Sequence, residues 1–419
     1  MKKVFILSII LLLLAGGYFA YTIFMVDNGI PKLDVEEEKV DIDELFIYGN
    51  YLNLHGNIIR DNNLKLVLYN GDFREYPINI KDNTFNLSYE INRGLFLEDI
   101  PIGTYYLFLR SKHYDEDDNE VYKYYVLNNT TDYVETTYYT FSNIGNKIVI
   151  NSDDEYHTLI FNVTKNTNDE VYDVVIDPGH GGKDGGANRG DYKEANFTMK
   201  YAADLKKKME KYGVKVKLTH VEGEIPSDEK MPDYGIHGRA VIGHEVNAKY
   251  VLSIHMNSNA YSSVHGLEVY TPANVNYDFA KDIVRNIIYG VDTNYSSNRI
   301  NKVFDGIYTR KFTEKDIELS IEDAEKNNKK PYDVTVNSNY YYMIRETGGI
   351  MTGAYVDDRN EPKFPANPYY KSNVGCEAYL LELGYLTNDG DLNSIINNMD
   401  KYTTAIAQSF KPIFDRTEA

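Results

Sequence analysis

The stretch VVIDPGHGG, residues 174–182, decides how the second half of this chain folds. It begins as a run of branched apolar residues, which is typical of a buried strand. It ends in glycines, which let the backbone turn sharply, and His180 stands at that turn. In open α/β sheets, ligands bind outside the carboxyl ends of the strands. The stretch therefore predicts an imidazole at the ligand-binding edge of a sheet.

Three further blocks place polar side chains in a similar way. They are KEAN (residues 193–196), VLSIHMNSN (residues 251–259) and LLELGYLTN (residues 380–388). With His180, the side chains that matter are Glu194, His255 and Glu382. Two imidazoles and a carboxylate bind zinc while leaving one coordination position open for water. A further carboxylate can manage the proton of that water. The four side chains together indicate a metal-assisted hydrolase.

The pattern from residue 171 onward predicts an α/β domain, with a mainly parallel sheet flanked by helices, over residues 171–419. We expect strands at residues 171–176, 214–218, 250–254, 266–270 and 379–383, and helices at residues 196–212, 237–247, 277–289, 392–397 and 402–414. His180, His255 and Glu382 all fall at carboxyl ends of strands, so one pocket can collect them. Glu194 enters from the first turn of the helix that follows.

The preceding part of the chain carries a different pattern. Short β-type runs with turn residues between them recur over residues 44–166. Several strands at such spacing predict an all-β sandwich, immunoglobulin-like or prealbumin-like. No group of residues in this part points to chemistry, so we interpret it as a spacer or a binding module.

The N-terminus predicts the location of the chain. Lys2 and Lys3 precede an uncharged, mainly apolar run at residues 4–26, which is long enough to span a hydrocarbon core of about 30 Å. We predict a transmembrane signal-anchor at residues 1–26 and a charged linker at residues 27–43. The positive charges before the run orient the remaining domains to the outside of a single-pass membrane protein. Small residues at 15–17 leave secretion after signal cleavage as the alternative.

The formal charge of −19 excludes nucleic acid as a partner, because phosphates require clustered lysine and arginine. The lone cysteine, Cys376, rules out an internal disulfide framework and is interpreted as a small core residue.

The four blocks, in this order and with these intervals, resemble the catalytic domain of the zinc-dependent N-acetylmuramoyl-L-alanine amidases, often called type 3 amidases. The resemblance covers residues 171–419. It implies one zinc ion held by His180, Glu194 and His255, with Glu382 as the catalytic carboxylate. It also implies that the substrate is peptidoglycan, cut between N-acetylmuramic acid and the L-alanine of the stem peptide by a zinc-activated water.

Three further residues are candidates for supporting roles. Asn196 and Asn257 are expected to contact the zinc ligands or the substrate. Arg345 is a candidate to pair with a carboxylate of the stem peptide, and a structural salt bridge with Glu346 or another neighbour is an equal alternative.

The chain departs from the resemblance in two places. Residues at about 295–375 form an insertion relative to compact relatives, and a charged helix-like segment lies at residues 313–329. The insertion is expected either to cover the zinc and make activity conditional or to be a surface excursion. A protein activator is expected to bind, if at all, to the insertion or to the β-sandwich. The second departure is Glu377, where many relatives have proline.

Two rival functions stay open on the sequence. One is a catalytically silent or conditionally inhibited wall-binding protein, and the other is a zinc peptidase that acts on a different amide.

Overall fold

The computed structural model describes residues 33–415, except 37–38, 59–62, 130–134, 142–144, 154–155, 223–232, 329 and 355–365. The predicted transmembrane helix at residues 1–26 lies outside the described residues, and so does the first part of the predicted linker. Within the described ranges, no helix is both long and apolar enough to cross a membrane.

The second half of the chain contains the expected α/β fold. Its strands form one sheet in the order β16-β13-β17-β22-β18-β20-β19. Their bounds are β13 Val174–Pro178, β16 Val216–Leu218, β17 Tyr250–Asn257, β18 Glu268–Tyr270, β19 Lys302–Phe304, β20 Ile307–Tyr308 and β22 Glu377–Tyr385. The four consecutive strands β16, β13, β17 and β22 are parallel, whereas β18 runs antiparallel to β22. The prediction of a mainly parallel sheet is confirmed.

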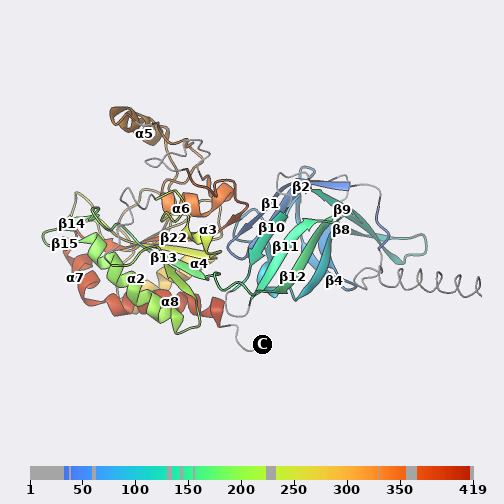
Figure 1. The fold of residues 1–419 in the computed structure, drawn as a ribbon, viewed down its shortest axis with the longest axis horizontal. Coiled ribbons are helices and arrows are strands. Elements are labelled where there is room, and N and C mark those ends of the chain that lie inside the picture. The colour runs from blue at the N-terminus through green and yellow to red at the C-terminus, as the bar shows by residue number, and fades with distance from the viewer. Residues whose placement is uncertain are drawn as a thin grey trace, which may run out of the picture.

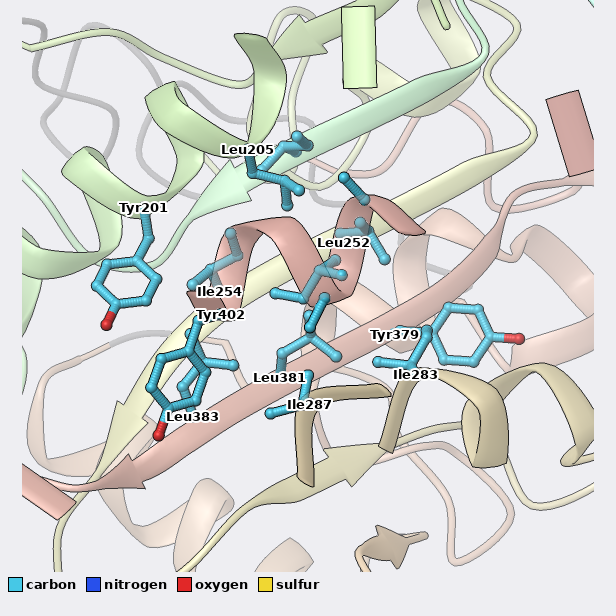
Figure 2. Packing of buried hydrophobic residues seen from close by; sticks show 14 of the residues in the cluster. Tyr201, Leu205, Leu252, Ile254, Ile283, Ile287, Tyr379, Leu381, Leu383 and Tyr402 are labelled. Carbon is cyan, nitrogen blue, oxygen red and sulfur yellow. The ribbon is translucent and has the colours of Figure 1, made fainter. Parts of the chain in front are cut away.

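Both faces of this sheet are covered, because its central strands are apolar at successive positions. One face packs against α2 (Glu194–Glu210), α4 (Asp278–Val291) and α8 (Met399–Phe414). Figure 2 shows this packing: Leu252 and Ile254 of β17 and Leu381 of β22 meet side chains of the three helices. The opposite face packs against α3 (Ile242–Glu245) and α6 (Tyr342–Thr347).

Alternation along the strands places the site residues on the second face. In β17, Val251 belongs to the cluster with α3 and α6, and His255 is an even number of residues away. In β22, Leu380 belongs to the same cluster, and Glu382 follows two residues later. Both functional side chains therefore project from the face that α3 and α6 cover.

The prediction of a helix at residues 237–247 is wrong for most of these residues. Only Ile242–Glu245 is helical. The backbone is left-handed at both ends of the predicted helix, His237 (φ 62°) and Asn247 (φ 52°). Between them, the amide of Ala240 donates to the carbonyl of Asp233 in place of a bond four residues back. The other helices of this half form near their predicted positions, including α7 (Asp389–Asn397).

The first half of the described chain is all-β. Its strands belong to one hydrogen-bonded network that follows the path β10-β11-β12-β8-β9-β1-β2-β6-β5, with β3, β4 and β7 attached. Their bounds are β1 Lys39–Tyr48, β2 Tyr51–Asn57, β3 Leu64–Tyr69, β4 Phe73–Pro77, β5 Asn79–Lys81, β6 Thr84–Asn86, β7 Leu95–Phe96, β8 Gly103–Tyr114, β9 Glu120–Asn129, β10 Glu135–Tyr139, β11 Asn146–Ser152 and β12 Leu159–Lys165. The pairing of β1 with β9 is parallel. The immunoglobulin-like or prealbumin-like sandwich stays a prediction.

The two halves share a hydrogen-bonded seam (Figure 1). Strand β1 pairs in parallel with β21 (Val374–Gly375), which directly precedes β22. Asn92 of the all-β half donates from Nδ2 to Oε1 of Glu377 at 2.7 Å, and the hydroxyl of Tyr48 accepts from the amide of Ala378 at 3.2 Å. The all-β half thus contacts the beginning of the strand that carries Glu382.

Candidate metal centre

Glu194 is the first residue of α2, and its carboxylate is fixed from two sides. Its side chain is only 4% exposed. Oε1 accepts a hydrogen bond from the amide of Met256 at 2.9 Å, and Oε2 accepts one from the amide of Ala187 at 2.8 Å. Backbone groups of two other segments therefore hold the carboxylate in place, as expected for a preformed ligand.

The two histidines meet this carboxylate from either side. Nε2 of His180 lies 3.0 Å from Oε2 of Glu194, and Nδ1 of His255 lies 2.9 Å from Oε1. The two rings stand almost perpendicular, with centroids 4.9 Å apart. The predicted ligand set is therefore assembled in the fold.

The donor set fits a zinc ion. One ligand atom from each of His180, Glu194 and His255 lies within 4.8 Å of the others. Zinc binds nitrogen and oxygen at about 2.0–2.2 Å, so ligand atoms around one tetrahedral ion are about 3.4 Å apart. The nitrogen–oxygen separations of 2.9 and 3.0 Å are close to that value, and small movements would admit an ion.

Two glycines make room for this arrangement. A Cβ atom at Gly179 would lie 2.3 Å from Cε1 of His255, which real structures do not show. A Cβ atom at Gly186 would lie 2.5 Å from Cδ2 of His180 and 2.6 Å from Oε2 of Glu194, and Gly186 also has a left-handed backbone with φ 64°. Glycine at these two positions is a packing requirement of the site.

The pKa values of His180 and Glu194 shift in opposite directions because each group stabilises the charged form of the other. Burial lowers the pKa of His180, but the hydrogen bonds and charges of Glu194 and Asp184 outweigh it and raise that pKa to about 9. Burial raises the pKa of Glu194, but the two imidazoles more than compensate and hold it well below its usual range. The carboxylate thus favours positive charge on the partners it faces, a preference that a bound cation also satisfies.

Asp184 supports the site, and the sequence reasoning missed it. Its Oδ2 lies 2.7 Å from Nδ1 of His180, on the ring nitrogen that does not face Glu194. Ligating histidines commonly bind a carboxylate through their second nitrogen, which fixes the orientation of the ring. The available signal was its position in the glycine-rich loop, four residues after His180.

Glu382 lies beside the ligand set. It is paired in register with His255 across β17 and β22, and it is 9% exposed. Its Oε2 is buried and has no hydrogen-bond partner among the described residues. Burial, followed by the nearby charges of Glu194 and Glu268, raises the pKa of Glu382 well above its usual range. An unpaired buried carboxyl group is costly, which favours a functional role over packing.

The candidates for supporting roles have different surroundings. Asn257 donates from Nδ2 to Oε2 of the buried Glu268 at 3.2 Å. Glu268 is paired in register with Glu382, so Asn257 is connected to the candidate catalytic residue through Glu268. Asn196 is exposed on α2, and the structure gives no contact between it and the ligands.

Arg345 does not reach the surface. It is 1% exposed, and Nε donates to Oε1 of Glu346 at 2.7 Å while Nη1 donates to the carbonyls of Asn339 and Tyr340. A stem peptide has no access to it there. The structural salt bridge was the correct interpretation, and the proposed substrate contact is wrong.

Two helices of the insertion have different positions: α6 packs on the sheet face that carries the site, and α5 (Glu314–Lys326) extends away from the fold. Helix α6 covers the face from which His255 and Glu382 project. Helix α5 stands away from the sheet in Figure 1, and of its residues only Ala324 is buried. This placement favours a surface excursion over a zinc-covering lid for the helical segment.

Comparison with known proteins agrees with the site. A family model described as N-acetylmuramoyl-L-alanine amidase matches residues 174–411. The "Probable cell wall amidase LytH" of Staphylococcus aureus is 31% identical over 122 residues, which are 27% of this chain and 38% of that protein. The chain thus matches well under half the length of this relative.

Solved structures also show similarity to this chain. The N-acetylmuramoyl-L-alanine amidase AmiC2 of Nostoc punctiforme is 22% identical, with a TM-score of 0.36 over 59% of this chain and 98% of that one. The catalytic domain of the amidase CwlV from Bacillus (Paenibacillus) polymyxa var. colistinus is 20% identical, with a TM-score of 0.38 over 58% of this chain and 99% of that one.

Proposed function

The chain belongs to the N-acetylmuramoyl-L-alanine amidase family, whose model matches more than half of it, and we propose that it is a zinc-dependent peptidoglycan amidase. Its reaction is hydrolysis of the amide between N-acetylmuramic acid and the L-alanine of the stem peptide. The observation that carries the proposal is the cluster of His180, Glu194 and His255 beside Glu382, whose Oε2 has no hydrogen-bond partner in the described part of the chain.

His180, Glu194 and His255 would hold the ion. When bound, zinc supplies polarisation of an amide carbonyl and lowers the pKa of a water molecule from about 15.7 to about 7. The chain itself contributes metal ligands that are held in fixed positions. Backbone amides fix the carboxylate of Glu194, and Asp184 fixes the ring of His180. One coordination position stays open with three protein ligands, as in catalytic zinc sites.

Glu382 would act as the general base and then as the general acid. It would accept a proton from the attacking water at the free Oε2 and deliver it to the nitrogen of the departing L-alanine. Burial raises the affinity of this carboxyl group for a proton, which suits the first transfer, in which Glu382 accepts the proton of the water. The charge of a cation held by the three ligands would favour the ionised form of Glu382 that this transfer requires.

The location of the enzyme is part of the proposal. The uncharged run at residues 4–26 supports a single membrane anchor, and the preceding lysines support an outward orientation of the remaining chain. Peptidoglycan is then within reach of the catalytic domain. Fractionation of cells that express the full chain, with protease added to intact spheroplasts, tests this: the anchored protein stays with the membrane and is digested from outside.

Digestion of peptidoglycan tests the proposed reaction. Purified chain is incubated with sacculi after zinc loading or after removal of metal with a chelator, and the soluble products are identified by mass spectrometry. The proposal predicts zinc-dependent release of stem peptides that begin with L-alanine. Cleavage inside the stem peptide would instead indicate the zinc peptidase, and binding to sacculi without any product would indicate the wall-binding protein.

A further inference from the structure

The backbone of His180 has an unusual conformation. Its φ is 65°, in the left-handed region that residues with a Cβ atom seldom occupy. Such a conformation persists only where the surrounding structure holds it. The same residue presents Nε2 to Glu194 at 3.0 Å. The position of the His180 imidazole therefore depends on the contacts that stabilise the backbone at residue 180.

Arg239 contacts the backbone of His180 directly. Nη2 of Arg239 donates a hydrogen bond to the carbonyl oxygen of His180. The guanidinium is itself anchored, because its Nε lies 3.1 Å from Oδ1 of Asp177, and both side chains are almost completely buried. The pair lies under the loop that carries His180 and not in the ligand set.

Asp177 ties this arrangement to the central sheet. It lies in β13, three residues before His180, and is 0% exposed. Its Oδ1 accepts a hydrogen bond from the hydroxyl of Thr219, next to the end of β16, and its Oδ2 accepts one from Ser253 in β17, both at 2.7 Å. Neighbouring strands on both sides thus hold the carboxylate that holds Arg239.

The third contact of Arg239 comes from the insertion. Its Nη1 donates to the hydroxyl of Tyr342, the first residue of α6, at 3.4 Å. The planar guanidinium therefore donates hydrogen bonds from Nη1 to a phenol and from Nη2 to a carbonyl, while Nε makes an ion pair with a carboxylate. The single ammonium of lysine cannot match this fork.

We propose that Arg239 is a positioning residue of the metal centre, which holds the His180 imidazole in its ligating position from a guanidinium fixed between Asp177 and Tyr342. The inference rests on the proposed function, because it assumes that the three ligands bind zinc. The inference also assigns a function to α6 of the insertion, because Tyr342 of this helix is one of the two residues that hold the guanidinium of Arg239.

Zinc affinity tests the inference independently of catalysis. The dissociation constant of zinc is measured by competition with a chromogenic chelator for the full chain and for Arg239→Lys, which keeps a positive charge next to Asp177. Tyr342→Phe removes only the hydroxyl that supports Arg239. Arg285→Lys is the matched control, because Arg285 is 59% exposed on α4 and pairs only with Asp282 among the described residues. Thermal unfolding of each metal-free variant is recorded in parallel.

We expect Arg239→Lys to weaken zinc binding by ten- to a hundredfold. Tyr342→Phe should weaken it by a smaller factor of two or more, with little change in the unfolding temperature, and Arg285→Lys should leave it unchanged. If Arg239→Lys fails to fold, the affinity of Tyr342→Phe decides. Wild-type zinc affinity in a folded Arg239→Lys or, failing that, in Tyr342→Phe would overturn the inference. Absence of zinc binding by the wild type would instead contradict the proposed function.

Discussion

Replacement of Asn92 by alanine probes the seam between the two halves of the molecule. Nδ2 of Asn92 donates to Oε1 of Glu377 at 2.7 Å and to the carbonyl of Asn276 at 3.0 Å, while its Oδ1 accepts from the amide of Asn276 at 2.6 Å. Asn92 and Glu377 are 6% and 4% exposed. The substitution removes a donor from a buried carboxyl group that keeps only the hydroxyl of Tyr379 as a side-chain donor among the described residues.

The expected cost follows from those contacts. A buried group left without its partner loses about 1–3 kcal/mol, and hydrogen bonds to charged groups are at the upper end of this range. Asn92→Ala should therefore lower the free energy of unfolding by about 2–4 kcal/mol. Burial already raises the pKa of Glu377, so the carboxyl group will take up a proton more readily in the variant.

Urea unfolding, followed by circular dichroism at neutral pH, measures this loss. Asn79→Ala is the control, because Asn79 is exposed on β5 and, among the described residues, its Nδ2 donates only to Asn86 and to the carbonyl of Leu87, both in the all-β half. The control should change the free energy of unfolding by about 0.5 kcal/mol or less. A loss in Asn92→Ala no larger than that of the control would refute the view that this hydrogen bond stabilises the seam.

Three further outcomes are expected. Gly179→Ala should abolish stoichiometric zinc binding, because the new Cβ would lie 2.3 Å from Cε1 of His255; metal analysis after dialysis that finds one ion per chain would contradict this. Asp184→Asn should weaken zinc binding by about ten- to a hundredfold, because the carboxylate 2.7 Å from Nδ1 of His180 fixes that ring; an unchanged chelator-competition curve would exclude the role. Burial lowers the pKa of His244 to about 4, so the unfolded state binds more protons between about pH 6.5 and pH 4. The free energy of unfolding should fall by up to about 3 kcal/mol as the pH decreases through this window, and His244→Gln should lack this component when unfolding is measured at several pH values.

Local sequence patterns predicted the parts of the site that depend on single elements. The apolar runs of β13, β17 and β22 identified the strands, and their ends placed His180, His255 and Glu382 together. The continuous apolar runs of these strands and the helical repeat after Glu194 are both local properties. They survive in the fold because both faces of this sheet are covered.

The features that the sequence did not predict depend on contacts between distant segments. The helix expected at residues 237–247 is mostly absent, since the amide of Ala240 bonds to the carbonyl of Asp233 and the side chain of Arg239 pairs with Asp177. Arg345 was ambiguous between a substrate contact and a salt bridge, and only its burial decided the matter. Propensity and motif spacing carry no information on such long-range contacts.

The seam was also beyond the reach of the sequence. The all-β half was interpreted as a spacer or a binding module, yet it hydrogen-bonds to the beginning of β22. The structure gives Glu377 a hydrogen-bond partner in Asn92 of the all-β half. The pairing joins residues that are 285 positions apart, and no local pattern marks it.

Hydrolysis of a defined muropeptide by the wild type and by Glu382→Gln tests the central claim most directly. The substrate carries one N-acetylmuramoyl-L-alanine bond, both proteins are loaded with zinc and the bound metal is quantified, and the new amino group of L-alanine is measured. The account predicts release by the wild type and a rate lower by at least about a hundredfold in Glu382→Gln, with one zinc ion in each protein. Equal rates in the two zinc-loaded proteins would contradict the assignment of Glu382, and no cleavage of this bond by the zinc-loaded wild type would contradict the amidase.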